Sequence, residues 1–269
     1  MIIDTFTFFN ELELLEGRLE YLYDTVDWFV IVETDYTHSG DPKPLNYLAN
    51  IKRYQRFADK ILYWPFAADV TGLDFNYRPT AMDGNSAHWR LENTQRNHIR
   101  SALQLFPADA TVIISDLDEI PSKSAISTAE NILGTVAEAF SLDQILYYYN
   151  FDYHMPLLWT ASVVTTNRFA QEMTPQTLRS MGLSGNMPRI FNGGWHLSYW
   201  GGAERVSYKI QKFAHQELNH PEYTDVDAIR RRMSTGQDPY DRGQMVTTDI
   251  NSIPQDIRDI FSKYSVSHS

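Results

Sequence analysis

Apolar residues in the first 122 positions fall into two alternating patterns. Short runs rich in β-branched and aromatic residues are typical of buried strands, whereas apolar residues three or four positions apart predict helices. The strand pattern occurs at 2–9, 26–32, 60–64 and 111–114, and the helix pattern at 11–23, 46–58 and 90–105. Asn10 and Glu13 have the spacing of a capping box, so Asn10 is the predicted N-cap of the first helix. This alternation predicts an α/β fold with a mainly parallel central sheet and helices on both faces.

The pattern changes after residue 122. One more helix is predicted at 124–140, and the aromatic strands between 144 and 169 have no clear helix between them, which indicates an antiparallel or mixed extension of the sheet. The last third is rich in glycine and is predicted to be irregular, with short helices near 204–213, 225–234 and 254–264. No repeat, linker or low-complexity tract divides the chain, so residues 1–269 are expected to form one domain.

Composition excludes several classes of protein. The 269 residues carry a net charge of −11, and 43% of them are hydrophobic, as is ordinary for a folded chain with a sizeable core. The absence of cysteine excludes disulfides, thiolate metal sites and cysteine nucleophiles. The acidic balance argues against non-specific binding of nucleic acid. Aromatic residues make up 13% of the chain, which suits a large core or the lining of a sugar or nucleobase site.

The sequence carries no recognisable signal for a membrane or for export. No apolar run approaches the roughly 20 residues that span a bilayer. The first residues, MIIDTFTFFNELELLEGR, have neither the basic region nor the small-residue cleavage site of a signal peptide. A cytoplasmic protein without a membrane span is therefore expected.

Three carboxylates follow the predicted strand at 111–114. Asp116, Asp118 and Glu119 lie close together, and Pro121 then ends the regular backbone. Ligands of open α/β sheets bind beyond the carboxyl ends of the strands, and an extended backbone would point the Asp116 and Asp118 carboxylates the same way. Oxygen ligands at this spacing suit Mg²⁺ or Mn²⁺, with water and a substrate diphosphate completing the coordination.

The alternative for this cluster is a solvated acidic turn that caps the next helix. Acidic turns are common after strands, and an Asp-x-Asp pair by itself fits both interpretations. Without a counter-charge, however, three neighbouring carboxylates would repel one another and destabilise the fold. We therefore favour the metal interpretation.

Residues 114–121, Ile-Ser-Asp-Leu-Asp-Glu-Ile-Pro, resemble the signature of glycosyltransferase family 17. Further matches follow in the order of that family, at residues 9–18, 30–34, 36–45, 95–97, 194–199 and 209–217. The resemblance covers residues 1–235 and implies a GT-A-like nucleotide-sugar transferase fold, inverting chemistry, a divalent cation and UDP-GlcNAc as the donor. This chain is expected to lack the membrane anchor and stem of the animal members, so the resemblance does not identify the acceptor.

The resemblance assigns two residues to the nucleotide. Glu33 lies at the end of the second predicted strand, on the same edge of a parallel sheet as the acidic cluster, and Tyr36 in the following loop could stack on a base. The alternatives are a helix-capping carboxylate for Glu33 and ordinary packing for Tyr36. Residues 1–122 are accordingly expected to form the nucleotide-binding half, and residues 123–269 the acceptor-side half.

Several basic residues are candidates for phosphate or metal contacts. Arg96 either joins a surface ladder of charges with its helical neighbours or points inward to the diphosphate and the acidic cluster, and the family match at 95–97 favours the second. His196 follows two glycines that permit close approach of a ligand, and it is predicted to complete a metal site with Asp118 unless it is a core histidine. Lys209 and Arg189 are candidates for neutralising phosphate charge, with a solvated surface position as the alternative for each.

Inversion requires a base that deprotonates the acceptor hydroxyl, on the side of the sugar opposite the leaving diphosphate. Glu204, after a glycine pair, is the first candidate and Glu217 the second. Two other functions fit parts of the sequence. A haloacid-dehalogenase-like phosphatase also has Asp-x-Asp after an apolar strand, although usually near the N-terminus, and a non-catalytic carbohydrate-binding protein would explain the aromatic residues but not the carboxylates.

Overall fold

The computed structural model of the protein describes residues 1–264. The strands are β1 (Ile2–Thr7), β2 (Trp28–Thr34), β3 (Ile61–Phe66), β4 (Thr111–Asp116), β5 (Glu119–Pro121), β6 (Ala139–Tyr148), β7 (Tyr153–Trp159), β8 (Val163–Thr166), β9 (Arg189–Ser198) and β10 (Val246–Thr247). The α-helices are α1 (Leu12–Leu22), α2 (Asn46–Ala49), α3 (Ala87–Leu103), α4 (Lys123–Ile132), α5 (Asn167–Glu172), α6 (Pro175–Leu183), α7 (Ala203–Lys212), α8 (Pro221–Thr224), α9 (Val226–Thr235) and α10 (Gln255–Phe261). The 3₁₀ helices are η1 (Ile51–Lys60), η2 (Gln216–Leu218), η3 (Ile250–Ser252) and η4 (Ser262–Tyr264).

One sheet runs through the part of the chain that the structure describes. Its strands follow the order β10-β7-β6-β8-β4-β1-β2-β3, with β9 pairing with both β6 and β5. The strands β3, β2, β1 and β4 are parallel, and β6 and β9 form a second parallel pair. β8 is antiparallel to both β4 and β6, and so joins these two parts. The predicted α/β class, with a mostly parallel central sheet and a mixed extension, is therefore confirmed.

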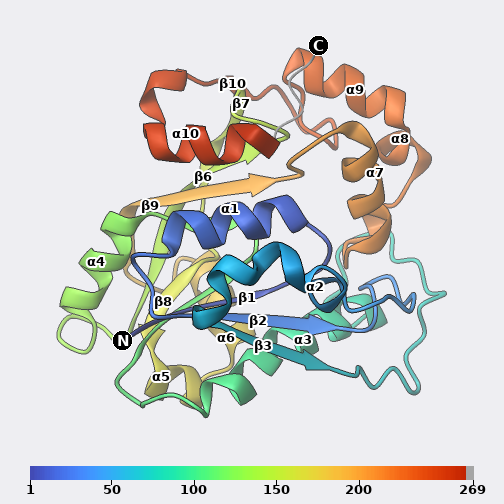
Figure 1. Cartoon of the computed structure of the whole chain (residues 1–269). Helices are drawn as coiled ribbons and strands as arrows, with labels where there is room; N and C mark the ends of the chain where they lie inside the picture. Colours follow the sequence, from blue (N-terminus) through green and yellow to red (C-terminus); the bar gives the residue numbers. More distant parts are fainter. Residues whose placement is uncertain (265–269) are drawn as a thin grey trace.

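Alternate residues of the central strands face opposite layers of helices, because successive side chains of a strand point to opposite faces. Phe6 of β1 belongs to a core shared with α1, η1, α4 and α10, whereas Ile3 belongs to a core shared with α3, α5 and α6. The prediction of helices on both faces is thus confirmed. The arrowheads of β2, β3 and β9 point toward the side of the molecule where α7 lies (Figure 1), and β1 runs parallel to β2. Ligands of such sheets bind at that edge.

Three local predictions for residues 1–140 are wrong. The predicted helix at 46–58 is a short α-helix followed by the 3₁₀ helix η1. The predicted helix at 124–140 already ends at Ile132, because Gly134 takes a positive φ of 71° and turns the chain toward β6. The capping box does not form: Glu11 is the N-cap residue of α1, no side chain caps the helix, and the Asn10 amide donates to the Glu11 carboxylate.

The C-terminal third is more regular than its glycine content suggests. The segment that contains Gly193 and Gly194 is the strand β9, which lies between β5 and β6. Gly194 has a φ of 125°, and a Cβ there would lie 2.1 Å from the carbonyl oxygen of Ile120, so glycine is what lets β9 approach β5 so closely. The helices α5 and α6, capped by the side chains of Thr166 and Thr174, were not predicted. The predicted helices near 204–213, 225–234 and 254–264 are present as α7, α9 and α10 with η4.

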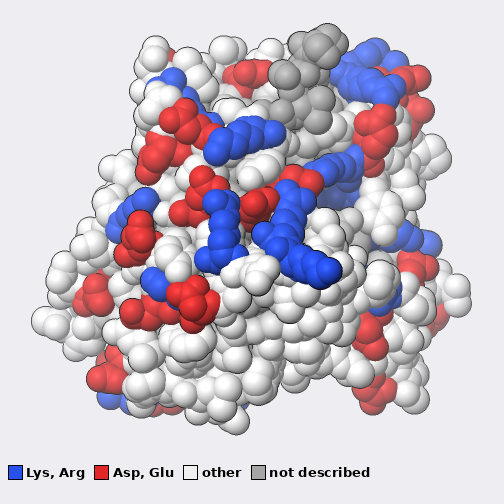
Figure 2. Space-filling model, in the orientation of Figure 1, with Lys and Arg blue, Asp and Glu red and all other residues white. Residues whose placement is uncertain are grey.

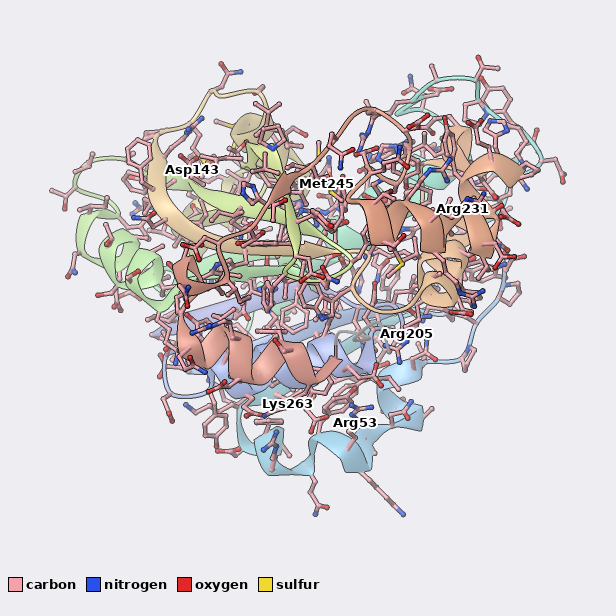
Figure 3. The ribbon with its side chains drawn as sticks, turned by 90° about the horizontal axis from the view of Figure 1, so that it is seen from above. Arg53, Asp143, Arg205, Arg231, Met245 and Lys263 are labelled. Atoms are coloured by element: carbon pink, nitrogen blue, oxygen red, sulfur yellow. The ribbon has the colours of Figure 1, made fainter. Side chains whose placement is uncertain are left out.

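The surface carries charges of both signs, which intermingle on the face seen in Figure 2. Part of this pattern comes from pairs between α1 and η1, such as Arg53 with Glu16 and Arg56 with Glu20. Within residues 1–264, no helix combines the length and the apolar character that crossing a membrane would need. Viewed from above, α10 packs against α1 (Figure 3). The helix α9, which carries the labelled Arg231, lies apart from this pair.

Candidate active site

A cavity of about 520 Å³ opens at the carboxyl edge of the parallel strands. It is bordered by the ends of β1, β4 and β9, by the loop after β2, and by α3, α6 and α7. Its charged, polar and aromatic lining includes Thr7, Tyr36, His38, Arg96, Asp116, Asp118, Arg179, His196 and Lys209. Side chains from distant parts of the sequence therefore meet at the edge where the fold class places a ligand.

The backbone of the acidic turn after β4 is hydrogen-bonded to Arg18 of α1, a residue that the sequence analysis did not single out. The Arg18 side chain is fully buried, and its Nε and Nη2 donate to the Asp4 carboxylate at 2.8 and 2.6 Å. Its Nη1 donates to the backbone carbonyls of Asp116, Leu117 and Glu119. The signal for it was present, because Arg18 stands among leucines on the apolar face of the first helix, where a cation must find buried acceptors.

The carboxylates of Asp116 and Asp118 engage different partners. Arg96 and Arg179 donate to Asp116 at 3.0 and 2.8 Å. Asp118, in contrast, accepts a hydrogen bond of 2.7 Å from Lys209. The strand β4 ends at Asp116 and the next two residues form a turn, so the extended backbone on which the predicted common direction of both carboxylates rested is not present.

Glu119 is buried behind the cavity rather than exposed to it. Its carboxylate accepts hydrogen bonds from the Trp159 indole, the Ser162 hydroxyl, the Asp116 amide and two nitrogens of Arg179. Burial by itself would raise the pKa of Glu119, but the Arg179 guanidinium and His196 together lower that pKa, to about 2. Glu119 therefore stays ionised and fixes both the turn and Arg179.

The acidic cluster is neutralised by the protein's own cations. Arg96, Arg179 and Lys209 pair with it, so the unbalanced repulsion that favoured a metal in the sequence analysis is absent. Burial lowers the pKa of Lys209 and that of Arg179, but the neighbouring carboxylates raise both pKa values by more than burial lowers them. Both residues therefore remain cationic. Arg179 was missed because it lies on α6, a helix that the sequence pattern did not reveal.

We expect this network to make the fold sensitive to acid. A carboxyl with a lowered pKa contributes stability that is complete above its unfolded-state pKa, 4.5 for Glu119, and that is lost as the pH falls through its folded-state value near 2. Urea unfolding at a series of pH values should therefore show the unfolding free energy falling across this window. In Glu119→Gln the fall should be smaller, and an equally steep fall in that variant would contradict the assignment.

The structure brings three of the predicted site residues to Asp118 or Asp116, and a fourth to the same cavity. Arg96 is buried beside Asp116, as predicted, and Tyr36 lines the cavity. The Nε2 atom of His196 lies 3.5 Å from Asp118, and Lys209 pairs with the same carboxylate. Burial would raise the pKa of Asp118, but Lys209 and His196 hold it well below its ordinary value.

Two predicted residues do not reach the cavity. Glu33 is fully buried and accepts the Asn46 and Tyr47 amides at the start of α2 and the Lys43 ammonium, so the helix-capping alternative describes its contacts. Arg189 pairs with Asp143 at the opposite end of β9 from His196. Seven strand residues span roughly 20 Å, so Arg189 is too far from the acidic turn to bind the same phosphates.

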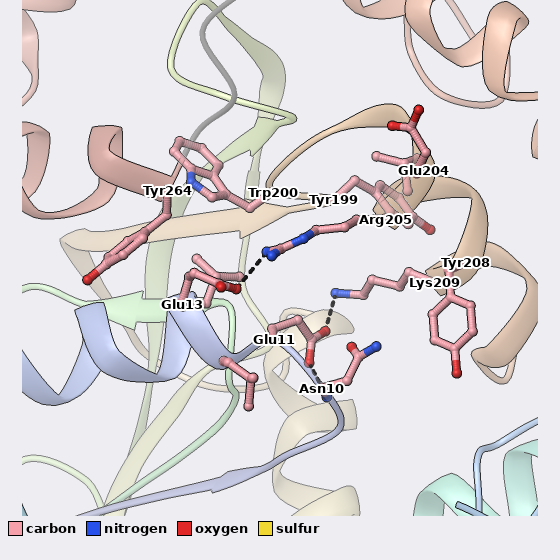
Figure 4. Close-up of a pocket in the computed structure, with 13 residues that line it drawn as sticks. Asn10, Glu11, Glu13, Tyr199, Trp200, Glu204, Arg205, Tyr208, Lys209 and Tyr264 are labelled. Atoms are coloured by element: carbon pink, nitrogen blue, oxygen red, sulfur yellow. Dashed lines mark hydrogen bonds and ion pairs between the residues drawn. The ribbon is translucent and has the colours of Figure 1, made fainter. Parts of the chain in front are cut away.

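The two predicted bases differ in their surroundings. The Glu204 side chain is 65% exposed and pairs with Arg230, and its carboxylate points away from Lys209 (Figure 4). Glu217 is only 9% exposed and accepts a hydrogen bond from His215 at 2.6 Å. His215 lines the cavity but Glu217 does not. The role of either glutamate as a base stays a prediction, and the geometry does not favour Glu204.

The donor atoms present suit a divalent cation only in part. Within residues 1–264, no three side chains of His, Asp or Glu converge as a preformed metal site would require, so the predicted set of Asp116, Asp118 and His196 does not form one. Asp118 and His196 do lie together, and His196 has its buried Nδ1 without a hydrogen-bond partner. Because Mg²⁺ is usually held by one or two carboxylates together with substrate phosphates, Asp118 and His196 are the residues that would hold such a cation here.

The chain belongs to glycosyltransferase family 17, whose family model matches residues 1–248. Among characterised proteins it is similar to the β-1,4-mannosyl-glycoprotein 4-β-N-acetylglucosaminyltransferases of rat and human, each 26% identical over 131 residues. That match covers 46% of this chain but only 22% of the relatives' length. The family match favours neither the phosphatase nor the non-catalytic alternative, so we do not retain them.

Two solved structures show a low similarity to the chain. One is a 4-diphosphocytidyl-2C-methyl-D-erythritol synthase from Anaerococcus prevotii, with 9% identity and a TM-score of 0.42 over 71% of this chain and 86% of that one. Another synthase of the same name has 10% identity and a TM-score of 0.39 over 71% of this chain and 89% of that one.

Proposed function

We propose that the protein is an inverting, metal-dependent glycosyltransferase of GT-A-like architecture that transfers N-acetylglucosamine from UDP-GlcNAc to a hydroxyl of a carbohydrate acceptor. The observation that carries the proposal is the meeting of Asp118, His196 and Lys209 in a large cavity at the carboxyl edge of the sheet. A nucleotide sugar has a diphosphate that needs positive charge, and this edge supplies it.

The cavity offers separate contacts for the parts of the donor. The loop after β2, with Tyr36 and His38, would border the nucleoside. Asp118 and His196 would hold a Mn²⁺ or Mg²⁺ ion, which when bound offsets the negative charge that grows on the departing diphosphate.

The Asp116 carboxylate would bind the sugar part of the donor. Arg96 and Arg179 fix the two oxygens of this carboxylate, whose side chain is 30% exposed and lines the cavity. A carboxylate held in this way keeps free lone pairs for sugar hydroxyls. The acceptor oxygen then attacks the anomeric carbon from the opposite side, the bond from that carbon to the diphosphate breaks, and the electron pair leaves with UDP.

The donor assignment predicts a selective stabilisation. UDP-GlcNAc with Mn²⁺ at 100 times its dissociation constant should stabilise the protein by about 2.7 kcal/mol, since it binds only the folded state. For a chain of this size, a thermal-shift assay should record a rise in the melting temperature of roughly 5–10 °C. GDP- and CMP-sugars serve as controls. A larger shift with one of them, or the absence of GlcNAc transfer to any of a panel of glycosides, would contradict the proposal.

A further inference from the structure

A second cavity, of about 280 Å³, lies between the start of α1 and α7 and adjoins the larger one (Figure 4). Three residues line both cavities: Glu11, Tyr199 and Lys209. The Lys209 ammonium lies 3.2 Å from Glu11 and 2.7 Å from Asp118, so it stands at the boundary. The two cavities are therefore neighbours, separated at this point by the side chains of Glu11, Tyr199 and Lys209.

The walls of the second cavity combine aromatic rings with charged hydrogen-bonding groups. Trp200 and Tyr264 lie at one end and Tyr208 at the other (Figure 4). Trp200 is held in place, because its indole donates to the Phe261 carbonyl. Arg205 pairs with a carboxylate of α1 between these rings. A sugar ring has C–H faces that pack on aromatic rings and hydroxyls that bond to charged groups, so this lining suits a carbohydrate.

We infer that the second cavity binds the acceptor sugar and that Glu11 is the base that takes the proton of the attacking hydroxyl. The inference rests on the proposed function, because it assumes that the larger cavity holds the nucleotide sugar. Acceptor and donor must then meet where the two cavities join, and the base must belong to that junction.

Among the three residues at the junction, Glu11 alone is suited to accept a proton. Lys209 is a cation between two carboxylates. The Tyr199 hydroxyl is buried against that of Tyr240, and burial raises the pKa of Tyr199, which keeps the phenol protonated. Glu11 accepts from Lys209 through one oxygen and from the Asn10 amide through the other, and each oxygen keeps a free lone pair.

The step balances without a further reagent. The acceptor hydroxyl gives its proton to Glu11 as its oxygen forms a bond to the anomeric carbon. The bond from that carbon to the diphosphate breaks, and the electron pair departs on UDP. Glu11 then returns the proton to solvent.

Glu11→Gln tests the base, with Glu16→Gln as the matched control. Glu16 lies on the same helix and pairs with Arg53 and Arg56 outside both cavities. In Glu11→Gln, turnover should fall by roughly 10²–10⁴ while the thermal shift with UDP-GlcNAc and Mn²⁺ persists. Glu16→Gln should transfer sugar at the rate of the unaltered protein. Glu204→Gln should lose less than Glu11→Gln, and the reverse order would overturn the assignment.

Tyr208→Ala tests the acceptor site. Methyl glycosides of mannose, galactose, glucose and N-acetylglucosamine serve as probes. Loss of one aromatic contact should raise the KM of the accepted glycoside about threefold to tenfold and leave the KM of the donor unchanged. A change in the donor KM alone would overturn the acceptor site.

The outcomes separate the inference from the proposed function. If the unaltered protein transfers sugar and Glu11→Gln does so at the same rate, the base assignment fails and the glycosyltransferase proposal stands. If the unaltered protein neither binds nor transfers any nucleotide sugar, the proposed function fails and the inference fails with it. If Glu11→Gln loses both transfer and donor binding, Glu11 supports the donor site and is not the base.

Discussion

Replacing Arg18 with Met should lower the free energy of unfolding by about 3–5 kcal/mol. Removing one partner of a buried ion pair leaves the other charge without compensation, and here the stranded group is Asp4, which is also fully buried. Three carbonyls of the acidic turn would lose their donor as well. Urea unfolding at neutral pH measures the effect.

Arg53→Met is the matched control for that experiment. Arg53 also pairs with carboxylates of α1, but at the surface, where such pairs contribute about 0–1 kcal/mol. A loss in Arg18→Met as small as in Arg53→Met would refute the role of Arg18 as the support of the turn. Replacing Asp4 and Arg18 together by apolar residues should recover part of the stability, because no unpaired charge then remains.

Replacing Asp118 with Asn should lower turnover by about a thousandfold, since a bound cation supplies several kcal/mol of charge stabilisation in the transition state. Binding of UDP-GlcNAc should lose its dependence on Mn²⁺, which titration calorimetry with and without the metal would measure. The protein should also become less stable, because Lys209 loses its nearest carboxylate. The sequence by itself suggested that removing this charge would make the protein more stable, because it did not reveal the cations that pair with the acidic turn.

Asp143→Asn is the control that separates a loss of stability from a loss of turnover. Asp143 is likewise buried and paired with a cation, Arg189, but it lies away from both cavities. Its replacement should reduce stability while sugar transfer continues at the normal rate. Undiminished Mn²⁺-dependent binding in Asp118→Asn would remove Asp118 from the metal site.

Local patterns were sufficient to predict the part of the site that one segment of the chain supplies. The apolar run at 111–114 and the acidic residues after it predicted a ligand edge, and the strand does end there in a cavity wall. The same patterns could not predict the directions of the two carboxylates. Asp118 follows Asp116 in a turn rather than in an extended backbone, and Arg18, which contacts that turn, lies 98 residues away in the sequence.

The remaining misses have the same origin. Arg179 reaches Asp116 and Glu119 from a helix with no clear apolar periodicity. Glu11 is unremarkable in sequence, and its place at a junction of cavities comes from the approach of α7, nearly 200 residues further along the chain. Glu204 was favoured as the base because of neighbouring glycines, but no local signal reports that its side chain turns outward.

The contact between α1 and α10 has a consequence for the synthesis of the protein. α10 packs on α1 so closely that a Cβ on Gly17 would lie 2.7 Å from the ring of Phe261, and Ile257 and Phe261 share a core with Leu15 and Leu19. α10 also lies beyond residue 248, where the family match ends. During synthesis, therefore, Leu15 and Leu19 lack this part of their packing until residues 255–261 have been made.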